Sequence, residues 1–387
     1  MKGGGSLRVH SIDVTRGIAL LGILLINVMS FHAPFLYVDP YTYWEEEFWL
    51  YSLIDLFVQG SFYPLFSLLF GFGTVFLFEK CVREGRRFLS VYIRRLLFLA
   101  IVGLLHGLFI WSGDILFAYA LTGVVSGLFI KLPAKPLLII GGLWFLVPQL
   151  LMGGLMFLAS LSSGGDMGMP VDVVGIQQSI EAYRYGSWAE IQQMRFTDWQ
   201  KSNGSAIIVF QIGMLVPFFL IGMGLAKTNL FRGHQTTGAL TWFWILFTVG
   251  IAIKLIPYVT SFSLGPFTVH EYIGGPLVAF SIPFLVHSLV QNGRVTRVAN
   301  ALANMGKLSF TMYLLQSLIG TFVFYNIGFG LYSQVTLLQG TLFAIALYTV
   351  QVVAANLWMR NFQIGPFEFV WRAVTYGKRP EMKRDES

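Results

Sequence analysis

Two histidines set in apolar sequence, His32 and His106, have the side chains of this chain best suited to proton transfer. A neutral imidazole can act as a general base near pH 7, and a carboxylate beside it orients the ring and stabilises its protonated form. Asp114 follows His106 by eight residues, which is about 12 Å along a helix. Contact between these two side chains therefore requires the chain to bend back at the intervening Ser112 and Gly113.

The segment that carries His32 begins with charged residues. Asp13 and Arg16 stand at its entrance, and a helical rise of about 1.5 Å per residue places Asn27 about 16 Å beyond Arg16. By the same rise His32 lies about 24 Å beyond Arg16. This segment therefore has a cation at its start, an amide near its middle and a histidine towards its end.

The segment that carries His106 has a similar order. Arg94 and Arg95 stand at its start, and His106 lies about 16 Å beyond Arg95, at the depth of Asn27. A guanidinium can bind phosphate through two parallel hydrogen bonds, so these arginines favour a phosphate-bearing ligand. Simpler roles remain open. Asn27 can bond a neighbouring helix, either histidine can be a buried packing residue, and the arginines can mark topology alone.

Composition decides what kind of protein must hold these residues. The chain has 387 residues, of which 55% are hydrophobic and 12% charged, whereas soluble domains carry about 25% charged residues. We therefore predict a polytopic membrane protein. The single cysteine, Cys81, excludes a disulfide framework and any metal cluster built on cysteines, and we predict no metal site. The net charge of +7 is interpreted as a topology signal, without a nucleic-acid partner.

Hydropathy predicts an all-α transmembrane helical bundle that forms a single integral membrane domain over residues 1–387. A spanning helix needs roughly 20 mostly apolar residues. About ten segments meet that test, near 17–36, 61–79, 96–112, 115–131, 136–161, 205–226, 238–258, 272–290, 308–328 and 336–358. The apolar stretch 48–58 either extends the second span or lies along the interface.

The distribution of lysine and arginine predicts the orientation. Alternate connections hold 22 of the 26 basic residues, and basic loops stay in the cytoplasm. Both termini are then cytoplasmic. The connection 162–204 is extracytoplasmic, and its helical pattern over 173–200 predicts either a surface cap or a lid. The tail 359–387 is cytoplasmic and contains an amphipathic segment suited to the membrane interface.

One weak internal echo is present. Pro64 is followed by the run Gly71-Phe72-Gly73, and Pro217 by the run Gly222-Met223-Gly224, each shortly before a basic connection. The echo is too short to indicate a transporter-type repeat.

Four sequence motifs together resemble the bacterial YeiB-like family of membrane proteins, and the resemblance covers nearly the whole chain. They are SIDVTRGIALLGI at 11–23, LHGL at 105–108 with GDIL at 113–116, LLQS at 314–317, and IGPFE at 364–368 with TYG at 375–377. This resemblance implies a multi-pass protein of the bacterial cytoplasmic (inner) membrane and leaves the reaction open.

A more distant resemblance bears on the reaction. Arg16-Gly17 followed by an apolar helix to Asn27 resembles heparan-α-glucosaminide N-acetyltransferase and the acyltransferase-3 family. The latter places a catalytic histidine where this chain has Asn27. The former has asparagine there and its essential histidine further along, which points to His32, although the interval is shorter here. His106 is the competing candidate.

The distant resemblance implies acyl transfer across the membrane, with acyl-CoA as co-substrate. Its phosphates are then expected near Asp13, Arg16, Arg94 and Arg95. His106 or His32 deprotonates a small-molecule or glycan acceptor from the outer side, Asn27 positions the thioester or its oxyanion, and Asp114 supports the histidine. Membrane lipids are expected partners, and a homodimer is one possible assembly.

Two other classes of function remain. Spans interrupted by glycine and proline suit a transporter or lipid-handling protein, but Asp55, Asp114 and the two histidines are sparse for an ion relay. A non-catalytic scaffold would use the same polar residues only as structural bonds.

Overall fold

The computed structural model describes residues 9–162, 168–228, 230–231, 237–293 and 296–384, and within these ranges it contains helices and no strand. Seven helical segments are long and apolar enough to cross a membrane. They are α1 (His10–His32), α3 with α4 (Phe48–Phe57, Phe62–Arg83), α5 (Phe88–Phe109), α7 (Ala134–Ser162), α10 (Ser205–Lys227), α13 to α14 (Leu264–Val269, Gly275–Gln291) and α17 (Leu337–Asn361). The expectation of an all-α membrane bundle is confirmed.

Each of the ten predicted spans coincides with a helix, but three of these helices are too short to span a membrane on their own. α6 (Leu116–Gly127) and α11 (Thr237–Lys254) are shorter apolar helices. α16 (Ser309–Phe324) reaches spanning length only together with α15 (Thr296–Lys307), from which it is bent by 76°. The stretch 48–58 extends the second span, because α3 and α4 pass the length test as one segment.

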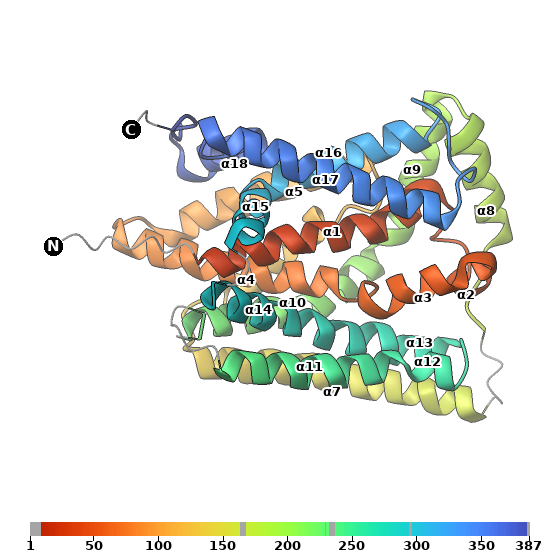
Figure 1. Cartoon of the computed structure of the whole chain (residues 1–387), viewed down its shortest axis with the longest axis horizontal. Helices are drawn as coiled ribbons and strands as arrows, with labels where there is room; N and C mark the ends of the chain where they lie inside the picture. The colour runs from red at the N-terminus through yellow and green to blue at the C-terminus, as the bar shows by residue number, and fades with distance from the viewer. Residues whose placement is uncertain (1–8, 163–167, 229, 232–236, 294–295, 385–387) are drawn as a thin grey trace.

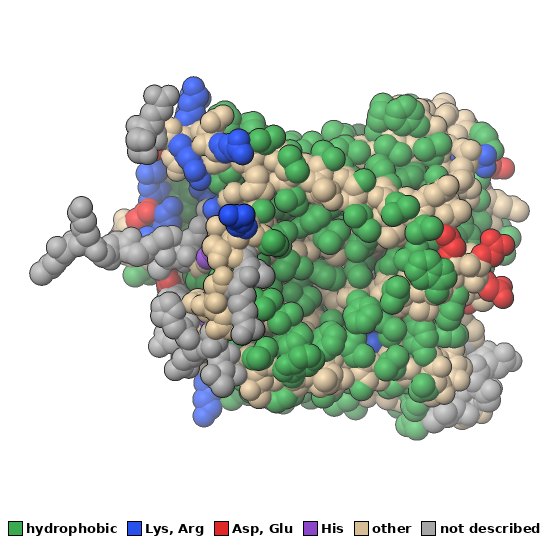
Figure 2. All heavy atoms as spheres, in the orientation of Figure 1, with side chains coloured by type: hydrophobic (Ala, Val, Ile, Leu, Met, Phe, Trp, Pro, Cys, Tyr) green, Lys and Arg blue, Asp and Glu red, His purple; other side chains and the backbone are tan. Residues whose placement is uncertain are grey.

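The bundle has two chemically different ends. Both chain termini lie at one end, and the lysines and arginines gather there (Figures 1 and 2). Acidic side chains gather at the opposite end, near the start of α3, and hydrophobic side chains cover the wide band between (Figures 1 and 2). We call these the basic end and the acidic end. The described chain thus begins and ends at the same end of the bundle.

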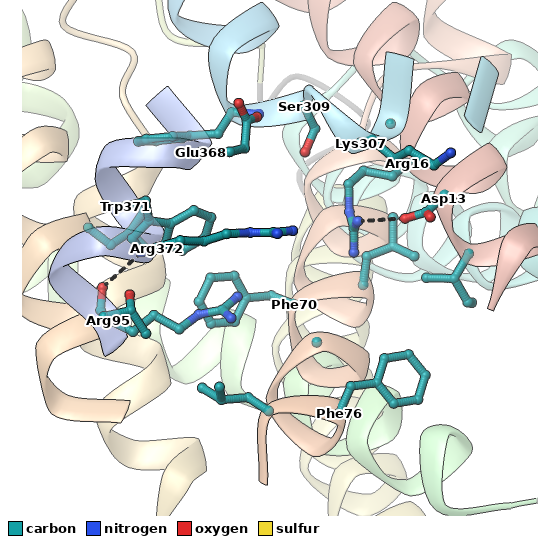
Figure 3. A pocket seen from close by; sticks show the side chains of 18 of the residues that line it. Asp13, Arg16, Phe70, Phe76, Arg95, Lys307, Ser309, Glu368, Trp371 and Arg372 are labelled. Carbon is teal, nitrogen blue, oxygen red and sulfur yellow. Dashed lines mark hydrogen bonds and ion pairs between the residues drawn. The ribbon is translucent and has the colours of Figure 1, made fainter. Parts of the chain in front are cut away.

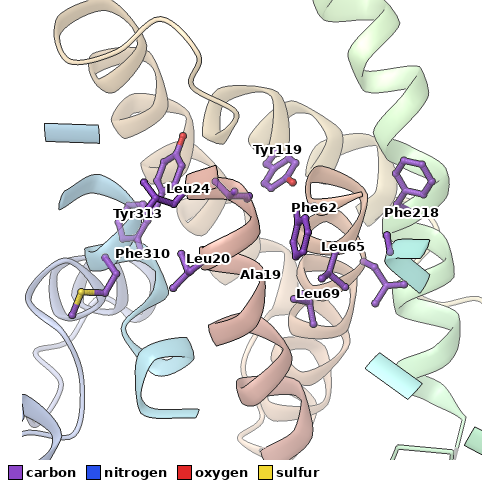
Figure 4. Packing of buried hydrophobic residues seen from close by; sticks show 14 of the residues in the cluster. Ala19, Leu20, Leu24, Phe62, Leu65, Leu69, Tyr119, Phe218, Phe310 and Tyr313 are labelled. Carbon is purple, nitrogen blue, oxygen red and sulfur yellow. The ribbon is translucent and has the colours of Figure 1, made fainter. Parts of the chain in front are cut away.

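Helix α1 runs through the middle of the bundle, where it packs against α4, α14, α15, α16 and α17 (Figure 1). Its Leu20 and Leu24 are fully buried on the side towards Phe310 and Tyr313 of α16, while Phe62 and Leu65 of α4 lie on its other side (Figure 4). Lipid is as apolar as these side chains, so close packing rather than removal from water holds the helices together.

Glycines bring pairs of helices into backbone contact. Gly71 of α4 meets the carbonyl of Phe219, and Gly222 of α10 meets the carbonyl of Leu68. The two segments of the internal echo are therefore each other's packing partners, through reciprocal contacts. Small residues permit this approach because a Cβ would overlap the facing backbone.

The sequence of α5 directs His106 into the bundle. Leu97, Ile101 and Leu105 recur every four residues and are exposed, as expected of a lipid-facing stripe. Gly103 and His106 lie on the other face and are buried. The histidine is thus inward because the apolar stripe opposite it faces lipid.

Two peripheral segments close the ends of the bundle. At the acidic end, α8 (Val173–Ile180), the π-helix η2 (Glu181–Tyr185) and α9 (Trp188–Asn203) form the cap (Figure 1). Near the basic end, α18 (Pro366–Tyr376) packs on α5 and α16. Helices within 173–200 are as expected, whereas residues 163–167 of that connection lie outside the described ranges.

The α4–α10 crossing provides a stability test. We expect Gly222→Ala to lower the melting temperature of the detergent-solubilised protein, because the added methyl group overlaps the Leu68 carbonyl and overpacking costs about 1–3 kcal/mol. Gly213→Ala, on the same helix with open space around its Cα, is the matched control. Gly213→Ala should leave the melting temperature unchanged or raise it. Equal effects of both substitutions would contradict the proposed close crossing.

Candidate functional site

A cavity of about 640 Å³ extends from the basic end into the bundle, between α1, α4, α5, α6, α16 and α18. Residues far apart in the sequence form its walls, including Arg16 near the start of the chain and Trp371 near its end (Figure 3). Its deep end is lined by Ile115, Tyr119 and Tyr313. The cavity therefore joins the charged end of the bundle to its apolar interior.

Cations dominate the wall near the basic end. The cationic side chains are Arg16, Lys80, Arg83, Arg95, Lys307, Arg372 and Lys378, and the carboxylates are Asp13, Glu84 and Glu368. Arg16 is paired with Asp13 at 3.1 Å, and Lys80 lies 3.9 Å from Glu84. The excess of positive charge suits a ligand that carries several negative charges.

Aromatic rings hold one of these arginines in place. The Arg95 guanidinium lies 5.0 Å from the Phe70 ring centroid and 4.6 Å from that of Trp371. The Trp371 indole in turn donates to the Arg95 carbonyl oxygen at 3.3 Å. Arg372 and Arg16 point towards each other across the cavity (Figure 3). Two facing guanidiniums repel, so an anion between them would be stabilised by both.

The cavity separates the two neighbouring arginines of α5. Arg95 lines the wall, whereas Arg94 lies outside the lining. Arg94 donates instead to the Ser90 carbonyl at 3.2 Å, and its guanidinium lies beside Gly377. Of the four residues predicted to meet a phosphate ligand, the structure therefore brings Asp13, Arg16 and Arg95 together and leaves Arg94 apart.

Glu368 fastens α18 to the rest of the wall. Its carboxylate accepts from the backbone N–H of Phe310 at 2.8 Å and of Thr311 at 3.1 Å, at the start of α16. A carboxylate is stabilised at a helix N-terminus by the unpaired N–H groups there. Burial raises the pKa of Glu368, and the hydrogen bonds from Thr311 oppose that rise. This contact positions Trp371 and Arg372 over the cavity.

A histidine–carboxylate pair lies next to the deep end. His106 Nδ1 is 2.9 Å from Asp114 Oδ1, and both side chains are buried. Asp114 Oδ2 accepts from the backbone N–H of Phe117 at 3.0 Å, at the start of α6. The chain thus bends back between α5 and α6, as contact between these residues requires. His106 Nε2 is buried and makes no hydrogen bond within the described part of the chain.

One aromatic ring separates this pair from the cavity. The ring centroids of His106 and Tyr313 are 5.4 Å apart, and Tyr313 itself lines the cavity. His106 therefore lies close behind the wall of the deep end, with its free nitrogen in an apolar setting.

The other two predicted catalytic residues lie elsewhere. His32 is buried between Trp44 and Phe324, at ring centroid distances of 6.4 Å and 5.8 Å, and does not line the cavity. Asn27 is partly buried and is also absent from the lining. Of the two histidines left open by the sequence, His106 is the one that the structure places beside the cavity.

The cap closes His106 off from the acidic end. Arg195 of α9 donates to the Phe109 carbonyl at 2.7 Å, and Gln192 donates to the Leu108 carbonyl, both at the last turn of α5. Trp199 packs against Gly107. The cap thus rests directly on the residues that follow His106.

A second buried polar cluster was not predicted from the sequence. It contains Asp55 of α3, Lys254 of α11, and His270 and Glu271 of the π-helix η3 (His270–Gly274). Ionisable residues are sparse in each span taken alone, but the fold gathers these four from three segments. The sequence signals for it were weak, namely a lysine at an apolar helix end and an adjacent His-Glu pair.

Comparisons with known proteins find uncharacterised bacterial relatives along nearly the whole chain. Residues 225–378 match a family model described as a protein of unknown function, DUF418. The uncharacterised protein YxaH of Bacillus subtilis (strain 168) is 34% identical over 388 residues, which cover 95% of this chain and 94% of the relative. The uncharacterised protein YeiB of Escherichia coli (strain K12) is 27% identical, over 94% of this chain and 95% of the relative.

Similarity of this extent covers the cavity walls, the cap and the second cluster alike. The chain therefore belongs to the YeiB-like family of multi-pass membrane proteins.

Proposed function

We propose that the protein is a membrane acyltransferase that takes an acyl group from cytoplasmic acyl-CoA and transfers it to an acceptor from the opposite side. One observation carries this proposal, namely that a single cavity joins a cationic wall to the neighbourhood of the His106–Asp114 pair. The cationic wall suits the phosphates of CoA. The apolar lining between the two suits its acyl-bearing arm.

His106 is the proposed general base. Nδ1–H of His106 donates a hydrogen bond to Asp114, which leaves the lone pair of Nε2 available to a hydroxyl or amine acceptor. The acceptor loses its proton to Nε2 and attacks the thioester carbonyl, the carbon–sulfur bond breaks, and the CoA thiolate leaves and takes the proton from Nε2, which restores the neutral imidazole. Tyr313 lies between the cavity and His106, so its side chain must move for the thioester to reach the base.

The acceptor requires a second entrance. The cap covers the last turn of α5 through Arg195 and Gln192, so the acceptor site becomes accessible when α9 lifts, and the cap acts as a lid. Asn27 and His32 lie outside the cavity. In this proposal they are structural, and the assignment of the oxyanion to Asn27 has no geometric support.

Transport is a second candidate, favoured by a different observation. The cluster of Asp55, Lys254, His270 and Glu271 gathers charges inside the bundle, and such residues mark ion pathways in membrane proteins. A cavity reaching inward from one end also suits one state of a transporter. Activity in the absence of a transmembrane gradient distinguishes the enzyme from the transporter.

We further propose that the protein lies in the bacterial cytoplasmic membrane with its basic end in the cytoplasm. A green fluorescent protein fused after residue 384 should fluoresce, because it folds in the cytoplasm. Alkaline phosphatase inserted within 163–167 of the cap connection should be active, because it requires an oxidising exterior. The reverse pattern of reporter activities would overturn this orientation.

Binding of CoA tests the cationic wall. We expect Arg16→Ala and Arg372→Ala each to weaken CoA binding to the purified protein about tenfold or more, since a lost charge-assisted hydrogen bond costs about 1.5–3 kcal/mol. Isothermal titration measures the change. Arg360→Ala is the matched control because Arg360 is exposed and outside the cavity. If the unaltered protein binds no CoA, the acyltransferase proposal fails.

The histidine pair is tested by thioester cleavage. With acetyl-CoA and palmitoyl-CoA as probes, His106→Gln should reduce thiol release about 10²–10⁴-fold, the usual contribution of a general base. CoA affinity should stay unchanged, because His106 is remote from the cations. Asp114→Asn should reduce release in the same direction, and His32→Gln should leave it near the unaltered rate. Loss of release in His32→Gln with full activity in His106→Gln would reverse the assignment.

A further inference from the structure

The second cluster is built around one histidine. His270 is fully buried, and its Nδ1 lies 2.7 Å from the backbone carbonyl oxygen of Lys254. A carbonyl only accepts hydrogen bonds, so Nδ1 carries a proton in every state of the ring that keeps this contact. The chemistry of the cluster is then decided at the other ring nitrogen, Nε2.

Nε2 of His270 lies between a donor and an acceptor. It is 2.9 Å from Lys254 Nζ and 3.1 Å from Asp55 Oδ1. A neutral ring uses the Nε2 lone pair to accept from the Lys254 ammonium. A protonated ring uses the Nε2–H to donate to the Asp55 carboxylate. One nitrogen cannot do both, so the same positions serve two hydrogen-bonded arrangements that differ by one proton.

The partners of Nε2 are held independently of it. Lys254 Nζ also donates to the Gln59 carbonyl at 2.8 Å. Asp55 Oδ2 accepts from Tyr258 at 2.8 Å and from Tyr41 at 3.2 Å, while Asp55 Oδ1 has no donor other than His270 within the described residues. Each partner thus keeps a hydrogen bond when the protonation state of His270 changes. This lowers the energetic cost of changing the partner of Nε2.

The charge balance of the cluster also requires a proton. With His270 neutral, the carboxylates of Asp55 and Glu271 face the single ammonium of Lys254. An uncompensated charge away from water is costly, so one added proton brings the cluster to neutrality. Glu271 packs against Gly60, and its Oε2 makes no hydrogen bond within the described residues. The other titratable groups that face the cluster are the tyrosines Tyr41, Tyr51, Tyr63, Tyr258 and Tyr272.

Three segments with irregular backbone come together at this cluster. His270 and Glu271 belong to the π-helix η3 inside a spanning segment, and π-turns are frequent at functional sites. Lys254 ends α11, where the chain breaks before α12 (Ile256–Val259). Gly60, with φ of +69°, lies in the break between α3 and α4. Broken helices around buried charges are typical of ion-binding sites in membrane proteins.

We propose that Asp55, Lys254, His270 and Glu271 form a proton-binding centre that takes up one exchangeable proton, with His270 changing its hydrogen-bond partner from Lys254 to Asp55. This centre is separate from the cavity, since none of the four residues lines it. It does not rest on acyl transfer. Proton uptake removes the hydrogen bond from Lys254 of α11 to η3. It forms a hydrogen bond from η3 to Asp55 of α3.

Nitrogen NMR of the histidine rings tests the proposal in the full-length protein. The protein is labelled with ¹⁵N-histidine, placed in lipid nanodiscs and measured between about pH 5 and pH 9, the range in which histidine charge changes. We expect the His270 ring, identified by the signals lost in His270→Gln, to pass from a neutral to a doubly protonated form as the pH falls. A His270 ring in one form throughout this range would overturn the proposal.

Two variants should shift the transition in opposite directions. Asp55→Asn removes the acceptor of the protonated ring, so that form should be confined to lower pH by about one unit or more, a tenfold change in proton affinity. Lys254→Met removes the adjacent ammonium, so the protonated form should persist to higher pH by a similar amount. Shifts in the same direction, or none, would contradict the exchange of partners.

His287→Gln is the matched control. His287 is also fully buried, but its Nδ1 lies 3.3 Å from the Ser11 hydroxyl, on other helices than the cluster. This substitution should leave the His270 transition as in the unaltered protein. If Asp55→Asn does not fold, the transition in the unaltered protein and its shift in Lys254→Met decide the matter.

Discussion

Hydrocarbon offers no hydrogen-bond partner, so polar groups inside this bundle depend on partners within the protein. The fold meets that constraint at three places, and each of them uses irregular backbone. Asp114 lies in the sharp turn between α5 and α6, where it joins His106 to the start of α6. The cluster around His270 lies at a π-helix and two helix breaks. The cationic wall lies where α16 begins and α18 returns to the bundle. Regular helices carry the lipid-facing surface, and their interruptions carry the chemistry.

Close helix crossings set the spacing between these sites. Gly17 and Gly306 bring α1 and α15 into backbone contact, as Gly71 and Gly222 do for α4 and α10. α1 and α4 are both walls of the cavity, and they meet where Gly22 of α1 faces the Phe62 ring of α4. Arg95 is held by π-faces on both sides, from Phe70 and Trp371. The electrostatics of the wall therefore depend on the apolar packing of the helices that form it.

Much of the fold follows from hydropathy because a membrane span has a length requirement that a single sequence can meet or fail. The bend at Ser112 and Gly113 was foreseeable for a similar reason, since a histidine and a carboxylate eight residues apart meet only across a turn. The positions of Asn27 and His32 were not, because depth along a helix says nothing of the direction in which a side chain points. Arg372 escaped prediction as a wall residue, since the return of the chain end to α5 leaves no local pattern. The cluster around His270 escaped for the same reason, because its members come from segments some 200 residues apart.

The contribution of α18 to the cavity has a consequence for biogenesis. Arg16 enters the membrane with the first helix, whereas Trp371 and Arg372 are made only after α17, the last of the described spanning helices. Five of the seven cations of the wall are therefore made before Arg372 and Lys378. A chain truncated before Glu368 retains every described spanning helix and lacks only the part of the wall that α18 supplies, so insertion of the protein and completion of its cavity are separate events in time.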